Sequence, residues 1–83
     1  MASTTATGDR IQRRRTKTRA ALLEAAERAF TTRRYHEVRV EELAAAADVS
    51  VGSLYNQFGG KEGLYVAVAD RATRLFEQYL QRA

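Results

Sequence analysis

Residues 40–60 read Val-Glu-Glu-Leu-Ala-Ala-Ala-Ala-Asp-Val-Ser-Val-Gly-Ser-Leu-Tyr-Asn-Gln-Phe-Gly-Gly, and they carry the clearest structural pattern in the chain. Apolar residues recur at steps of three and four in its first half and again in its second half, which is the spacing of one helix face. Residues 48–50 interrupt the pattern, and Ser50 is a favoured residue type at the start of a helix. The stretch therefore predicts two short helices separated by a three-residue turn.

The first of these helices has an acidic start and an apolar face. Glu41 and Glu42 fall in its first turn, where carboxylates interact favourably with the positive end of the helix dipole. We expect a helix of about two turns, with an inward face made of Val40, Leu43, Ala44 and Ala47.

The second short helix divides into an apolar side and a polar side. Gly59 and Gly60 follow it, and glycine readily adopts the left-handed conformation that ends a helix. The spacing predicts an inward side of Val51, Leu54, Tyr55 and Phe58, and an outward side of Gly52, Ser53, Asn56 and Gln57.

A longer amphipathic segment lies upstream of the two short helices. It predicts a helix over residues 16–33, with an inward face of Leu22, Ala26, Ala29 and Phe30. The threonines at positions 16 and 18 can supply the oxygen that caps its first free amides.

A second long segment begins near Lys61 and meets no helix breaker up to residue 83. A three-helix core can cover only its first turns, so we expect the later apolar residues to face a downstream segment or another subunit. These residues are Leu75, Phe76, Tyr79 and Leu80. The predicted fold is all-α, with a three-helix helix-turn-helix domain over residues 16–60 and the start of a long fourth helix over residues 61–83.

Composition limits the kind of protein that the chain can be. It has 83 residues, a net charge of +4 and no cysteine, so it can form one small domain without disulfides or thiolate metal sites. Residues 1–40 carry ten Lys and Arg against four acidic residues, which suits a polyanionic partner, either nucleic acid or a membrane surface. We interpret residues 1–15 as a flexible basic arm.

The chain has no apolar run long enough to cross a membrane and no secretory signal, so we expect a cytoplasmic location.

The paired short helices predict a DNA-binding function. In a helix-turn-helix unit the second helix lies in the major groove, and its outward residues are small or form hydrogen bonds with base edges. Alanines on the first helix allow the close approach that such a unit requires. The four outward residues of the second helix are small or can form hydrogen bonds, so they meet the requirement for contact with base edges.

Residues 40–64 also resemble the DNA-binding signature of the TetR family. The resemblance rests on the pair Leu54 and Tyr55, on Phe58 three residues later, and on Lys61, Glu62 and Leu64 at the start of the next helix. Ala25 and Ala26, Ala29 and Phe30, and Tyr35 in the upstream part are similar to the family as well.

The resemblance implies a homodimer whose two recognition helices bind the half-sites of a palindromic DNA operator. A larger C-terminal helical domain, absent from these residues, would bind a small-molecule effector and form the dimer interface.

The resemblance also implies which residues contact DNA: Gly52, Ser53, Asn56 and Gln57 would face bases, and Tyr55 and Lys61 would bind phosphate. Lys61 lies at a helix N-terminus, where free amides favour an anion. We add Ser50 and Arg39 to the predicted phosphate contacts.

Two positions depart from the family pattern, and both add positive charge. Arg34 stands where a turn glycine is common, and Arg39 stands where a capping Thr is usual. The basic arm is longer than the family requires, and we expect it to contact DNA, with entry into an adjacent minor groove as a hypothesis. Its predicted contacts are Arg13, Arg14, Arg15 and Lys17.

The sequence offers no arrangement of side chains typical of an enzyme. Gly59, Gly60 and Lys61 lack the preceding glycine at position 55 and the following Ser or Thr of a phosphate-binding loop. His36 is the only histidine and has no companion ligands at metal-binding spacing. We expect no catalytic site, no metal and no cofactor.

Two other functions are compatible with the same residues. A helical interaction module would use the apolar end of the last helix and would not require Asn56 or Gln57. A non-specific polyanion binder would depend on residues 1–19 and would not distinguish between duplex sequences. The operator, the effector, the regulated genes and the sign of regulation do not follow from the sequence.

Overall fold

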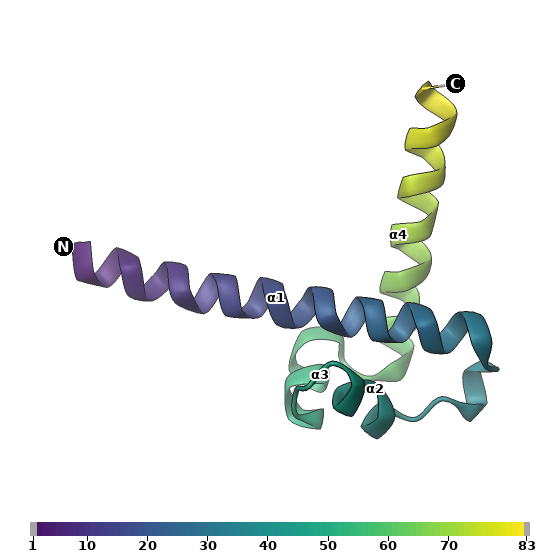
Figure 1. The fold of residues 1–83 in the computed structure, drawn as a ribbon, viewed down its shortest axis with the longest axis horizontal. Helices are drawn as coiled ribbons and strands as arrows, with labels where there is room; N and C mark the ends of the chain where they lie inside the picture. The colour runs from purple at the N-terminus through teal and green to yellow at the C-terminus, as the bar shows by residue number, and fades with distance from the viewer. Residues whose placement is uncertain (1, 83) are drawn as a thin grey trace.

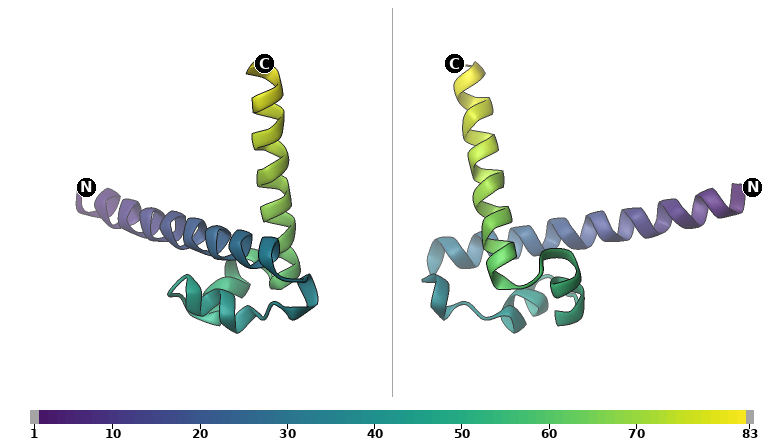
Figure 2. Two further views of the ribbon diagram at one scale, coloured as in Figure 1. Left: turned by 45° about the vertical axis from the view of Figure 1, so that its right-hand side comes forward. Right: turned by 180° about the vertical axis from the view of Figure 1, so that it is seen from behind.

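The computed structural model describes residues 2–82, with side chains described from residue 12 onward. Helix α1 (Ala2–Thr32) leads through a short 3-10 helix, η1 (Tyr35–Glu37), into α2 (Val40–Ala46), α3 (Val51–Phe58) and α4 (Lys61–Arg82). The all-α prediction is confirmed, since no strand occurs among the described residues. In Figures 1 and 2, α2 and α3 lie on one side of α1, and α4 crosses α1 and leaves on the other side.

Helix α1 is longer than the sequence predicted. The expected start was Thr16, whereas the helix begins at Ala2 and projects beyond the other helices (Figure 1). No proline interrupts this segment, and the Gln and Arg residues at positions 12–15 are good helix formers that extend the helix from the part packed on the core. The segment predicted as a flexible arm is therefore helical from Ala2 onward and continues α1.

Seven apolar residues, contributed by four helices and one loop, form the buried core. Leu22 and Ala26 of α1 meet Leu54 of α3 and Leu64 of α4, all fully buried. Val38, in the loop after η1, is buried too, and the sequence analysis did not predict this. None of the described polar or charged side chains is buried, so the core depends on apolar packing alone. The complete core is Leu22, Ala26, Val38, Leu43, Ala44, Leu54 and Leu64.

The turn between α2 and α3 has the hydrogen bonds of a Schellman motif. The Val49 amide donates to the Ala44 carbonyl at 2.9 Å, and the Asp48 amide donates to the Ala45 carbonyl at 3.1 Å. Asp48 has a φ of 57°, in the left-handed region where glycine is the usual residue. Val49 packs against the core from this turn and fixes the approach of the two helices.

Helix α3 has its ends where the sequence predicted them. The side chain of Ser50 accepts a hydrogen bond from the Ser53 amide at 3.1 Å, which confirms Ser50 as the N-cap. Gly59 ends the helix with a φ of 79°, and its amide donates to the Tyr55 carbonyl. Both ends of this eight-residue helix are therefore closed by local hydrogen bonds.

Helix α4 is packed only near its start. Leu64 is buried and Val68 lies partly buried against the core. Gly63 lies so close to the end of α3 that a Cβ there would come within 2.9 Å of the Phe58 carbonyl carbon. The predicted exposure of the later apolar residues is confirmed, because more than half of the surface of each is accessible: Leu75, Phe76, Tyr79 and Leu80.

Candidate DNA-binding surface

The exposed face of α3 centres on Gly52 and Asn56. Both are exposed, as predicted, whereas Ser53 and Gln57 lie on one flank and are half-buried. The Gln57 side-chain amide lies 3.5 Å from the Ser53 hydroxyl, at the limit of a hydrogen bond. The four predicted base-facing residues thus form one continuous surface, with its polar edge at Ser53 and Gln57.

The other flank of α3 differs from the prediction. Val51 and Tyr55 were expected to be buried, but they are 36% and 50% exposed, and only Leu54 is fully buried. The reason is that α3 is short and contacts the core through one narrow line of residues, so the flanks of its apolar side stay open. Phe58, at the end of the helix, is partly buried against the core.

The Tyr55 ring lies against the backbone of Gly60. A Cβ at position 60 would lie 3.2 Å from a ring carbon of Tyr55, and Gly60 has a φ of 130° that L-residues rarely adopt. The absence of a Cβ at Gly60 therefore allows the ring to lie close to the junction of α3 and α4. This arrangement places Tyr55 next to the segment that carries Lys61, another predicted phosphate contact.

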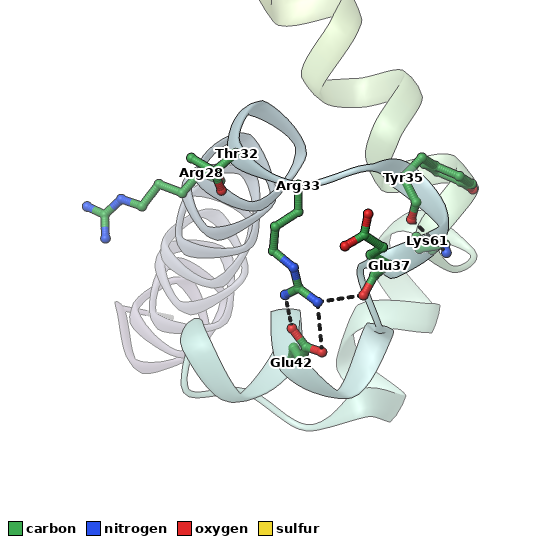
Figure 3. Close-up of polar contacts among 7 residues, drawn as sticks. All are labelled: Arg28, Thr32, Arg33, Tyr35, Glu37, Glu42 and Lys61. Carbon is green, nitrogen blue, oxygen red and sulfur yellow. Dashed lines mark hydrogen bonds and ion pairs between the residues drawn. The ribbon is translucent and has the colours of Figure 1, made fainter.

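Lys61 is held by Tyr35, the first residue of η1. Its ammonium donates a hydrogen bond to the Tyr35 carbonyl at 3.1 Å and lies 4.3 Å from the centre of the Tyr35 ring. Figure 3 shows Lys61 reaching from the start of α4 towards Tyr35. An ammonium group has three N–H donors, so this contact leaves others for a phosphate oxygen.

An ion pair fixes the end of α1 to α2. The Arg33 guanidinium binds the carboxylate of Glu42 and also donates to the Glu37 carbonyl at 2.6 Å (Figure 3). The hydrogen bond from Arg33 lowers the pKa of Glu42, and the same bond raises the pKa of Arg33. These contacts close the loop over residues 33–42 and position the start of α2.

Arg39 stands directly before α2 without capping it. It occupies the N-cap position with extended backbone angles, and its side chain forms no capping hydrogen bond. The guanidinium has no acceptor atom, so it cannot replace the hydroxyl of Thr or Ser at this position. Arg39 is exposed and remains accessible to a phosphate group.

Comparison with known proteins gives the family. The sequence profile of the family described as bacterial regulatory proteins, tetR family, matches residues 22–68, which include α2, α3 and the start of α4. The chain belongs to the TetR family. It contains the helix-turn-helix domain with which these transcription regulators bind DNA.

Two curated relatives of this TetR-family domain come from Mycobacterium tuberculosis, strains CDC 1551 / Oshkosh and ATCC 25618 / H37Rv. Each is named an uncharacterized HTH-type transcriptional regulator and is 40% identical over 67 residues, or 80% of this chain. The chain spans about a third of the length of these relatives, since the matched region covers 33% of each. No solved structure matches the chain significantly.

The helical form of α1 separates the basic residues predicted to act together as an arm. Arg15 precedes Leu22 by seven residues and so shares its side of α1, whereas Arg13 and Lys17 share another side with each other. An α-helix with its side chains is about 10–12 Å wide, and the minor groove is only about 6 Å wide. Arg14 projects between these two sides. In this form α1 itself is too wide to enter the minor groove, so the expected insertion of an extended arm does not apply to it.

Three contacts of this TetR-family domain were not predicted from the sequence. They are the cation–π contact between Arg19 and Phe58 at 4.6 Å, the Arg33 to Glu42 ion pair, and the contact of Lys61 with Tyr35. Each joins residues nine or more positions apart, and the spacing of residues in one sequence carries no signal for such pairs. Arg19 belongs to the predicted basic segment, but its position over the end of α3 depends on how α1 crosses that helix.

Proposed function

We propose that this domain binds a specific double-stranded DNA operator by placing α3 in the major groove. The observation that carries the proposal is the exposed face of α3, with Gly52 and Asn56 at its centre and Ser53 and Gln57 beside them. Glycine lets the backbone approach closely, and amide side chains can form paired hydrogen bonds with adenine. The four residues would determine sequence preference.

A second group of residues would determine affinity through phosphate contacts. Ser50 lies at the N-terminus of α3 and Lys61 at that of α4, where free amides favour an anion. Tyr55 lies on α3 beside Gly60, with half of its surface exposed. Phosphate contacts orient a protein on the duplex without reading its sequence. The proposed set is Arg39, Ser50, Tyr55 and Lys61, with Arg13, Arg14, Arg15 and Lys17 of α1 as further contacts.

We further propose that the whole protein is a homodimeric repressor. Two recognition helices would bind the half-sites of a palindromic operator and block access to a promoter. A downstream domain would bind a small-molecule effector and change the separation of the two helices. The exposed apolar end of α4 and a groove of about 420 Å³ between α1 and α4 support a downstream segment packed there. The protein would regulate transcription and catalyse no reaction.

The proposal is tested by selecting duplexes from a random pool at near-physiological salt. The wild-type chain is compared with the double variant Asn56→Ala plus Gln57→Ala. The matched control is Gln78→Ala plus Gln81→Ala, because it removes two exposed amides from α4, away from the core. The double variant on α3 is expected to lose or change the enriched half-site, and the control is expected to keep it.

Two outcomes would contradict specific binding by α3. Equal binding to every duplex, with a strong dependence on salt, would indicate a non-specific polyanion binder. Enrichment that survives unchanged in the Asn56→Ala plus Gln57→Ala variant would exclude these residues from base contacts. A chain that binds no duplex even at low salt would favour either an interaction module that uses the apolar end of α4 or a strict requirement for the downstream dimerisation domain.

No helix of the described residues is long and apolar enough to cross a membrane.

A further inference from the structure

The Lys61 side chain is held by Tyr35, a residue twenty-six positions earlier in the chain. Its ammonium donates to the Tyr35 carbonyl at 3.1 Å and lies 4.3 Å from the centre of the Tyr35 ring. A lysine side chain has four rotatable bonds and is ordinarily among the most mobile side chains. The two contacts restrict it to one region beside the start of α4.

The Tyr35 ring is itself fixed by two other aromatic rings. It stacks on Phe30 of α1 with ring centres 5.7 Å apart, and Tyr65 of α4 meets it edge to face at 5.2 Å. Tyr65 also meets Phe30 at 5.1 Å, so the three rings contact one another pairwise. Edge-to-face and offset stacked pairs are the favourable geometries for aromatic side chains. The ring under Lys61 is therefore held by α1 and α4 together.

We propose that Tyr35 is a positioning residue for the phosphate contact of Lys61. The inference rests on the proposed function, in which Lys61 binds a DNA phosphate at the N-terminus of α4. Binding then requires little further ordering of the side chain, because Tyr35 has already placed the ammonium group. The remaining N–H donors of the ammonium point away from the Tyr35 carbonyl and stay available for phosphate oxygens.

Tyr35 acts through both its carbonyl and its ring, and only the ring can be changed by substitution. Tyr35→Phe keeps the ring face that attracts the ammonium, whereas Tyr35→Leu keeps apolar bulk and removes the π system. Replacing residue 35 with pentafluorophenylalanine retains the ring shape and removes the negative ring face. These replacements separate attraction of the cation from simple packing against Phe30 and Tyr65.

The experiment is a double-mutant cycle with Lys61→Gln, measured as affinity for duplex DNA over a range of salt concentrations. The duplexes are the operator selected from the random pool and an unrelated sequence of equal length. Lys61→Gln should reduce the slope of log affinity against log salt by about 0.9, as expected for one phosphate contact. Thermal melting of every variant measures whether the fold is retained.

The expected result is a loss that depends on Lys61. Tyr35→Phe should bind as the wild type does, and Tyr35→Leu and the pentafluorinated residue should each weaken binding roughly two- to tenfold, the cost of immobilising one side chain. In the Lys61→Gln background the same changes at residue 35 should have no effect. Both duplexes should show the same coupling, because phosphate contacts are independent of sequence.

Equal losses in the two backgrounds would overturn the inference, because Tyr35 would then support only the fold. Unchanged affinity of the protein that carries pentafluorophenylalanine at position 35 and keeps Lys61 would also overturn it. Either result can occur while the operator is still selected, in which case the proposed function stands. Conversely, if no operator is selected, coupling between Tyr35 and Lys61 on the unrelated duplex would support the positioning role and contradict sequence-specific binding.

Discussion

Ser50 is predicted to have two separable effects, one on the stability of α3 and one on DNA affinity. Its hydroxyl oxygen accepts from the Ser53 amide at 3.1 Å. Helix α3 has only eight residues, and the amides of the first three have no backbone acceptor within the helix, since the Leu54 amide is the first to donate to a helix carbonyl, that of Ser50. Removing an N-cap hydroxyl costs about 1 kcal/mol, and we expect Ser50→Ala to lower the melting temperature by roughly 4–8 °C for a domain of this size.

Ser50→Asp separates the two effects. An Asp side chain also caps a helix, and its charge is favourable at the positive end of the helix dipole, so the melting temperature should match or exceed that of the wild type. If a phosphate lies beside residue 50, the added carboxylate should repel it, and affinity for the selected operator should fall by roughly tenfold or more.

The assay combines thermal melting, followed by circular dichroism, with duplex binding by the same preparations. Thr73→Ala is the matched control, because the Thr73 hydroxyl donates to the Ala69 carbonyl within α4 and caps no helix end. Its melting temperature should stay at or slightly above the wild-type value. A Ser50→Ala protein that melts with the wild type would refute the capping argument. A Ser50→Asp protein that binds the operator normally would refute a phosphate contact at this position.

Three further predictions concern the loop and turn that position α2. Arg39→Thr should be more stable than Arg39→Ala by about 1 kcal/mol in urea unfolding, because Thr can cap α2 and Ala cannot; equal midpoints would contradict this. Asp48→Gly should be more stable than Asp48→Ala by about 1 kcal/mol, since residue 48 has a φ of 57°, and the reverse order would exclude strain there. The hydrogen bond from Arg33 lowers the pKa of Glu42 from its ordinary value of 4.5. The ion pair therefore stabilises the fold above pH 4.5, and this stabilisation is lost as the pH falls through the lowered pKa. Melting temperatures measured from pH 6 down to about pH 2 should therefore fall less steeply for Glu42→Gln than for the wild type, and parallel curves would show that the pair contributes nothing.

The sequence predicted the elements whose signals are local. Residues that recur at helical steps placed α2 and α3 correctly, and the capping role of Ser50 and the helix-ending role of Gly59 follow from their residue types. The buried residues Leu22 and Leu54 were also predicted, because each belongs to an apolar stripe at helical spacing. These features depend on neighbours within one or two turns.

Features that depend on tertiary packing were beyond such reasoning. Periodicity assigned Tyr55 to the buried side, but it does not say how wide a strip of a short helix the core can cover. Val38 is buried because the loop after η1 folds back onto the core, and a loop residue has no periodic signal. The contact of Lys61 with Tyr35 likewise depends on where α4 starts relative to η1. The predicted base and phosphate contacts themselves remain predictions.

The continuity of α1 affects how its N-terminal part should unfold. Forming the first turn of a helix is the unfavourable step, and adding residues to an existing helix is far easier. In α1 the part around Leu22 and Ala26 is already ordered by the core, so residues 2–15 only have to extend it. Their helix content should therefore decline gradually on heating, before the cooperative transition of the core. A polyanion that binds Arg13 or Lys17 would reduce charge repulsion along the extension and shift that gradual change to higher temperature.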